Sequence, residues 1–95
     1  MPVIEHNPGD YLKTTPEDIA AYLNAAIEEM GDDPRLLMLA LRNVAKARGG
    51  ISELARQANL DRVALARALS GQRTPRLDTL AKVTGACGIK LRFSA

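Results

Sequence analysis

The residues with the clearest chemical potential lie in the stretch LDRVALARALSG, at positions 60–71. One side of the helix expected there carries two arginines, Arg62 and Arg67, among the small side chains of Val63, Ala64 and Ala66. Small side chains let a helix come close to the base edges in the major groove of double-stranded DNA, and an arginine can donate two hydrogen bonds to a guanine. The pattern therefore predicts a DNA-reading face, with a helix buried on both sides by protein as the alternative.

Two more arginines follow in the segment QRTPR, at positions 72–76. A cationic loop beside a groove-binding helix is well placed to contact phosphates, which position a protein on DNA without reading its sequence. We therefore expect Arg73 and Arg76 to bind the sugar-phosphate backbone.

Other kinds of chemistry find little support. The single cysteine, Cys87, and the single histidine, His6, cannot form a disulfide framework or a zinc site. Cys87 stands where a helix needs an apolar residue, so we expect it to be buried and structural. With three aromatic residues in the chain, a stacking platform for single-stranded nucleic acid is not expected. The sequence predicts no enzyme, no metal and no cofactor.

A chain of 95 residues with 46% apolar and 25% charged residues predicts one globular domain. We divide it into an N-terminal arm (1–14), two helices (15–48), a helix-turn-helix core (50–88) and a C-terminal strand (89–94). Since no apolar run approaches the length needed to cross a membrane and no signal peptide is evident, we expect a cytoplasmic protein without membrane contact.

The helices that must position these residues have local start and stop signals. Thr15-Pro16 and Asp33-Pro34 are typical helix starts, and Gly49-Gly50 ends the second helix. A third helix is expected at 51–58, a turn at Asn59 in the left-handed conformation, a fourth helix capped by Asp61, and a fifth at 77–87. The residues expected to face inward are Ile19, Leu23, Ile27, Met30, Leu37, Leu41, Val44, Leu54, Ala58, Leu65, Ala68, Leu69, Leu80, Val83 and Cys87.

The C-terminal sequence IKLRFS alternates apolar Ile89, Leu91 and Phe93 with Lys90 and Arg92. This alternation is typical of a strand with one buried face. Since a lone strand is not stable, it must pair with the N-terminal arm, a partner protein or the same strand of a second subunit. We expect antiparallel pairing in a homodimer.

Charge divides the chain into two halves. Residues 1–41 carry eight acidic and two basic side chains, a net charge of −6, whereas residues 42–95 carry eleven basic and three acidic side chains, a net charge of +8. This asymmetry indicates two faces with two kinds of partner, the basic face binding a polyanion. Mutual neutralisation of the two halves is the alternative.

The run GISELARQANLDRVALARALSGQRTPRLDTLAKVTGACGIKL, at positions 50–91, resembles the Xre-type (lambda-repressor-like) helix-turn-helix pattern. The wider chain, about residues 10–93, is similar to the probable addiction-module antidote proteins, HigA-like antitoxins, in YLKTTPEDIAAYLNAAIEE and LRNVAKARGGISELAR. The resemblance implies a mainly α, roughly five-helix lambda-repressor-like domain, with the short C-terminal β-strand added. It also implies a dimeric antitoxin that neutralises a RelE/ParE-like toxin and represses its own operon by binding operator DNA.

Carried onto this chain, the family pattern implies that Arg62, Val63 and Arg67 face the bases and that Ser52 and Arg73 contact the backbone. Ile51 and Asp61 depart from the pattern, which has a glutamine and a serine or threonine at those positions. Arg76 also departs from it, since it replaces a small helix-capping residue and offers a phosphate contact instead.

The acidic half then becomes the expected toxin-binding surface, because opposite charge speeds and orients association. Its candidate residues are Glu17, Asp18, Glu28 and Glu29. Two alternatives stay open: a stand-alone Xre-type repressor without a toxin, and a toxin-binding module whose helix-turn-helix does not bind DNA.

Overall fold

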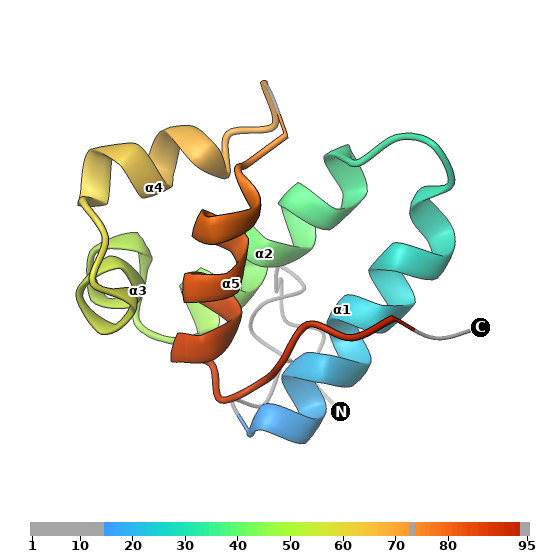
Figure 1. Ribbon diagram of the computed structural model, residues 1–95, viewed down its shortest axis with the longest axis horizontal. Coiled ribbons are helices and arrows are strands. Elements are labelled where there is room, and N and C mark those ends of the chain that lie inside the picture. The colour runs from blue at the N-terminus through green and yellow to red at the C-terminus, as the bar shows by residue number, and fades with distance from the viewer. Residues whose placement is uncertain (1–14, 73, 94–95) are drawn as a thin grey trace, which may run out of the picture.

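The computed structural model describes residues 15–72 and 74–93. These residues form five helices, labelled in Figure 1: α1 (Pro16–Met30), α2 (Arg35–Ala47), α3 (Ile51–Ala58), α4 (Arg62–Ala68) and α5 (Leu77–Ala86). The expected mainly helical architecture is therefore confirmed, whereas the N-terminal arm lies outside the described residues. None of the described helices is long and apolar enough to cross a membrane.

Each of the first two helices begins at its expected signal. Thr15 caps α1, because its Oγ1 accepts a hydrogen bond from the backbone N–H of Asp18 at 3.3 Å and donates one to the Asp18 carboxylate at 2.7 Å. Before α2, the Asp33 carboxylate accepts a hydrogen bond from the backbone N–H of Arg35 at 3.0 Å. Gly31 lies between them with a φ of +56°, which a residue with a side chain rarely adopts, and so α1 ends there.

Two local features, a left-handed residue and a helix cap, form the connection between α3 and α4. Asn59 has φ 57° and ψ 47°, the left-handed conformation expected from its residue type. Asp61 caps α4, since its Oδ2 accepts a hydrogen bond from the backbone N–H of Ala64 at 2.9 Å. The two helices are therefore joined by a short turn that fixes the direction in which α4 leaves α3.

The core is formed where the apolar sides of all five helices meet. The largest fully buried side chains are those of Ile19, Leu41, Val44, Leu54, Leu65, Leu69 and Val83. One expected core residue is wrong: Ile27 is 47% exposed, and the smaller Ala26 is buried in α1 instead. The reason is that α1 packs mainly on α2, so the side of α1 that bears Ile27 faces a groove at the edge of the core.

The predicted C-terminal strand is not seen, since no strand occurs within residues 15–72 and 74–93. The backbone N–H of Ile89 instead donates to the carbonyl of Thr84 at 3.0 Å, which closes the end of α5. Ile89 packs against the core, whereas Leu91 is 48% exposed and Phe93 is fully exposed. An alternating sequence forms a strand only beside another strand, and the described chain offers none.

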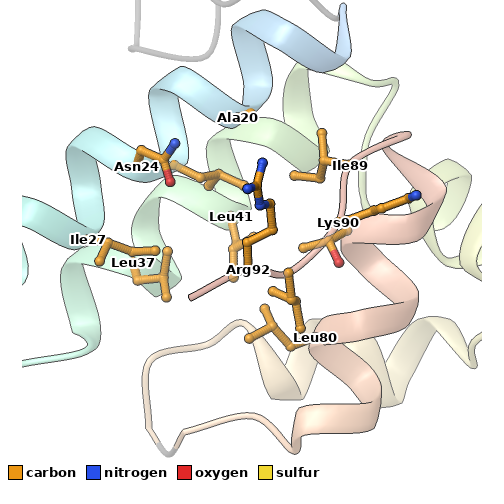
Figure 2. Close-up of a pocket in the computed structure, with 12 residues that line it drawn as sticks. Ala20, Asn24, Ile27, Leu37, Leu41, Leu80, Ile89, Lys90 and Arg92 are labelled. Atoms are coloured by element: carbon orange, nitrogen blue, oxygen red, sulfur yellow. The ribbon is translucent and has the colours of Figure 1, made fainter. Parts of the chain in front are cut away.

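Residues 89–93 instead run across α1, as the red segment of Figure 1 shows. A side chain at Gly88 would have its Cβ only 3.0 Å from Cγ of Pro16, so the segment starts in close contact with α1. Figure 2 shows the groove that results, with Ile27 of α1 on one wall and Lys90 and Arg92 of the segment on the other. Its volume is about 280 Å³.

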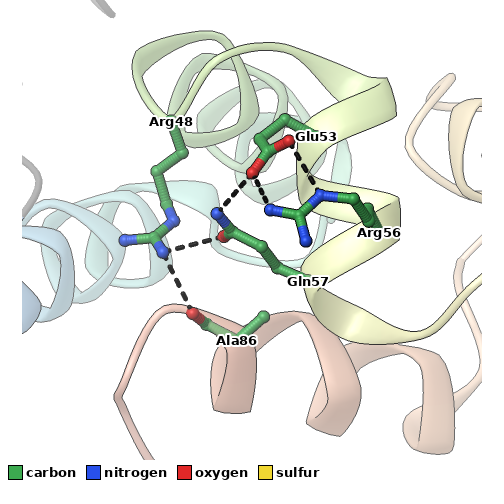
Figure 3. A network of polar contacts seen from close by, with 5 residues as sticks. All are labelled: Arg48, Glu53, Arg56, Gln57 and Ala86. Atoms are coloured by element: carbon green, nitrogen blue, oxygen red, sulfur yellow. Dashed lines mark hydrogen bonds and ion pairs between the residues drawn. The ribbon is translucent and has the colours of Figure 1, made fainter.

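A polar network ties α2 to α3 and α5 (Figure 3). Arg48 Nη2 donates hydrogen bonds to Oε1 of Gln57 at 2.8 Å and to the carbonyl of Ala86 at 3.2 Å. Gln57 Nε2 in turn donates to Glu53 at 2.9 Å, and Glu53 also forms an ion pair with Arg56. The hydrogen bond from Arg56, the larger effect, and the one from Gln57 lower the pKa of Glu53. This network holds α3 at a defined angle to α2, and thereby helps to position α4.

Candidate nucleic-acid interface

The residues predicted to form the DNA-reading face are all exposed on α4, Ala64 among them. Arg62, Val63, Ala66 and Arg67 are exposed, and Val63 leaves 56% of its surface accessible. The opposite side of this helix is anchored by Leu65, which is only 1% exposed. Because that anchor fixes the rotation of α4 about its axis, the outward side chains have a defined direction even though they have few protein neighbours.

The structure brings together two of the predicted site residues that are ten positions apart. Arg62 Nε donates a hydrogen bond to Oγ of Ser52 at 2.7 Å, across the turn between α4 and α3. Both side chains are exposed. Ser52, expected from the family pattern to contact the DNA backbone, thus lies directly beside a residue expected to face the bases.

A shallow groove of about 240 Å³ follows one side of α4. It is lined by Ala64, Arg67, Ala68, Thr74, Pro75, Arg76 and Thr79. Arg76 lies on its far wall, is exposed, and forms an ion pair with Asp78 at 3.3 Å. It makes no capping hydrogen bond to α5, in agreement with the expectation that capping is lost at this position. Arg73 lies outside the described residues.

A larger groove, of about 520 Å³, follows the other side of α4. It is lined by Arg42, Lys46, Gly50, Ile51, Ala66, Leu69 and Ser70. Arg42 and Lys46 are not among the site residues predicted from the sequence. Their four-residue spacing places both on one side of α2, but only the packing of α2 against the helix pair shows that this side opens toward α4.

The candidate toxin-binding residues lie on α1. Glu17, Glu28 and Glu29 are exposed, whereas Asp18 is half-buried and holds the Thr15 hydroxyl. A spacing of eleven residues is close to three helical turns, so Glu17 and Glu28 lie on the same side of the helix. In the view of Figure 1, α1 and α4 lie at opposite ends of the molecule. The acidic surface is thus well separated from the arginines of α4.

Other chemistry is not assembled in the described part of the chain. No group of three or more histidine, cysteine, aspartate or glutamate residues that could hold a metal ion occurs within residues 15–72 and 74–93. Cys87 is buried at 3% exposure, as expected, and this burial raises the pKa of its thiol against the opposing effect of the Arg48 charge. His6 lies outside the described residues.

Comparison with known proteins gives two matches. The family model described as probable addiction module antidote protein matches residues 3–95. An uncharacterized protein of Haemophilus influenzae is 37% identical over 79 residues, which covers 83% of this chain and 78% of that protein. No solved structure matches the chain.

Proposed function

Since the chain belongs to the family of probable addiction module antidote proteins, we propose that it is an antitoxin that binds operator DNA through α4 and its toxin through α1. An antidote implies a cognate toxin. A stand-alone repressor without a toxin is therefore a weaker hypothesis than an antitoxin.

The observation that carries the DNA-binding part is the outward side of α4. A surface helix normally exposes long charged side chains, but here Val63 and Ala66 are exposed between Arg62 and Arg67. Such a surface fits the major groove, where a short side chain can touch a thymine methyl group and a guanidinium can bind O6 and N7 of guanine. We assign base contacts to these four residues and backbone contacts to Arg73 and Arg76. The family pattern implies a backbone contact at Ser52 as well, but its hydrogen bond with Arg62 leads us to assign it the role of positioning that guanidinium.

The toxin-binding part rests on charge and separation. Glu17, Glu28 and Glu29 present carboxylates to solvent at the end of the molecule remote from α4. A basic toxin would be attracted to this surface and repelled by the arginines of α4. The sequence resemblance makes a small RelE/ParE-like protein the expected toxin, and the separation leaves room for toxin and DNA on one antitoxin.

Exposed apolar side chains support the homodimer. Leu91 and Phe93 remain accessible, and Leu91 lines the groove whose opposite wall bears the exposed Ile27. Apolar side chains clustered at a surface commonly mark a protein–protein contact. We therefore assign Leu91 and Phe93 to the proposed dimer contact. Ile89 instead packs against the core of its own protomer.

Co-expression and DNA binding together test the proposal. The reading frames on either side of the gene are identified, and each is expressed alone and with this chain while growth is followed and complexes are purified. The same purified antitoxin is titrated with the DNA upstream of its own gene. Rescue of growth together with sequence-selective DNA binding is the expected result. Rescue without DNA binding would identify a toxin-binding module, and selective DNA binding without rescue would identify a stand-alone repressor.

A further inference from the structure

Helix α4 lies between two grooves that both carry cations on their outer walls. On one side the wall bears Arg76, and on the other it bears Arg42 and Lys46 of α2. A helix in the major groove of DNA likewise lies between two sugar-phosphate backbones, about 12 Å apart. We propose that Arg42 and Lys46 bind the phosphates of one DNA strand while the Arg76 side of α4 faces the other strand.

The arrangement of the two α2 cations suits this role. Both side chains are exposed, and neither makes a hydrogen bond or an ion pair with any described residue. They are one helical turn apart, so they can follow successive phosphates along a strand. By contrast, Arg35 and Arg56 are held by neighbouring carboxylates. Arg42 and Lys46 thus have donors available for a ligand in the groove.

The groove itself favours a DNA backbone over an isolated anion. Ala66 of α4 and Ser70, just after this helix, line the groove opposite the two cations. A DNA strand in the groove would therefore contact both α4 and α2. The partly exposed Ile51 contributes apolar surface to the lining, which matches the apolar edge of deoxyribose. Positive charge at the rim and apolar surface within it therefore complement both parts of the sugar-phosphate chain. An acidic protein segment is the competing occupant.

This inference rests on the proposed DNA-binding function and adds α2 to the contact surface. It is tested with the purified full chain and two labelled duplexes, one carrying the DNA upstream of its own gene and one a random sequence of equal length. Affinities are measured across a salt series for the wild type, Arg42→Ala, Lys46→Ala and the double variant. Lys82→Ala is the matched control, since it removes the same charge from an exposed position of α5 that lines neither groove beside α4.

Each lost phosphate contact should lower the slope of log affinity against log salt by about 0.9, and the double variant should lower it by about 1.8. Relative to the wild type, the affinity of a single variant therefore falls by a further factor of about eight for each tenfold decrease in salt. Both duplexes should lose affinity equally, because phosphates carry no sequence information. Circular dichroism checks that the exposed substitutions leave the fold unchanged.

Three outcomes would overturn the inference in different ways. Variants with the wild-type slope would show that the wild-type protein binds DNA without the α2 groove, which leaves the proposed function standing. Variants that bind DNA normally but lose the co-expressed toxin would assign the groove to a protein segment. A wild-type chain that binds neither duplex at low salt would remove the DNA-binding function and the inference together.

Discussion

Arg62 Nε and Ser52 Oγ form a 2.7 Å hydrogen bond that joins the first residue of α4 to the first turn of α3. The bond uses only Nε of the guanidinium, so the two terminal nitrogens remain able to donate to a ligand. Ser52 therefore restricts the Arg62 side chain while it leaves the fork of donors exposed. In the proposed function, Ser52 is a positioning residue for Arg62.

A double-mutant cycle tests this relationship. Ser52→Ala should weaken operator binding by about 0.5–1.5 kcal/mol, because Arg62 then has to be ordered on binding. In an Arg62→Ala background the same Ser52 substitution should have almost no effect, which gives a coupling energy of similar size. Additive losses would instead mean that Ser52 contacts a phosphate independently of Arg62. Fluorescence anisotropy on the four proteins provides the affinities.

The acidic side of α1 predicts a separation of functions. Reversal of Glu28 and Glu29 to lysine should slow association with the toxin by about tenfold or more at low salt, since electrostatic attraction becomes repulsion. Operator affinity should change little, because α1 is remote from α4. Stopped-flow or surface-plasmon-resonance rates measure the effect. Unchanged toxin kinetics together with a loss of DNA binding would contradict this division.

The exposed C-terminal side chains predict the oligomeric state. The wild-type chain should sediment as a dimer, and replacement of Leu91 and Phe93 by glutamate should give monomers, since burial of two carboxylates in an apolar contact is strongly unfavourable. The monomeric fold should persist, because neither side chain is buried in it. Analytical ultracentrifugation of both proteins decides the matter. A double variant that remains dimeric would place the interface elsewhere.

The pair of Asp33 and Arg35 predicts a specific acid titration. The hydrogen bond from the Arg35 side chain lowers the pKa of Asp33 from 3.8 to about 2. Because the folded pKa is lower than the unfolded one, the stabilisation is complete above about pH 4 and is lost as the pH falls toward about 2. An NMR titration of the Asp33 carboxyl should find this low value, and Asp33→Asn should lack the corresponding change in stability. A pKa near 3.8 would show that solvent screens this exposed pair.

Features that depend on a few neighbouring residues could be predicted from the sequence. Asn59 adopts the left-handed conformation and Asp61 caps α4, because each device needs only its own residue type and the adjacent backbone. The buried positions of Leu65 and Leu69 likewise follow from helical spacing. Since these residues determine the rotation of α4, the exposed site on its other side was also predictable.

Features that depend on distant partners could not be predicted in the same way. Ile27 has the spacing of a core residue, but the neighbours of α1 leave it half exposed. The alternation that ends at Phe93 is genuine, but a strand requires a partner strand that the described chain does not provide. In the sequence, Arg42 and Lys46 look like any cations on a helix surface. Only the packing of α2 in the fold shows that they lie beside α4.

The central claim is that α4 reads DNA bases, and Arg67 tests it most directly. This residue is exposed, lies on the side of α4 opposite Leu65, and lines the groove that leads to Arg76. Arg67→Ala should therefore leave the circular dichroism spectrum unchanged while it removes a contact to DNA. Affinities are measured for the operator, for its single-base variants and for random DNA, with Arg76→Ala as the phosphate-contact control.

The claim predicts that Arg67→Ala costs about 1–3 kcal/mol on the operator, relaxes the preference at one base pair and hardly affects random DNA. Arg76→Ala should weaken binding to all sequences alike and lower the salt slope by about 1. If Arg67→Ala instead lowers the affinity for operator and random DNA equally, and no base pair loses its preference, then α4 does not read bases and the central claim is wrong.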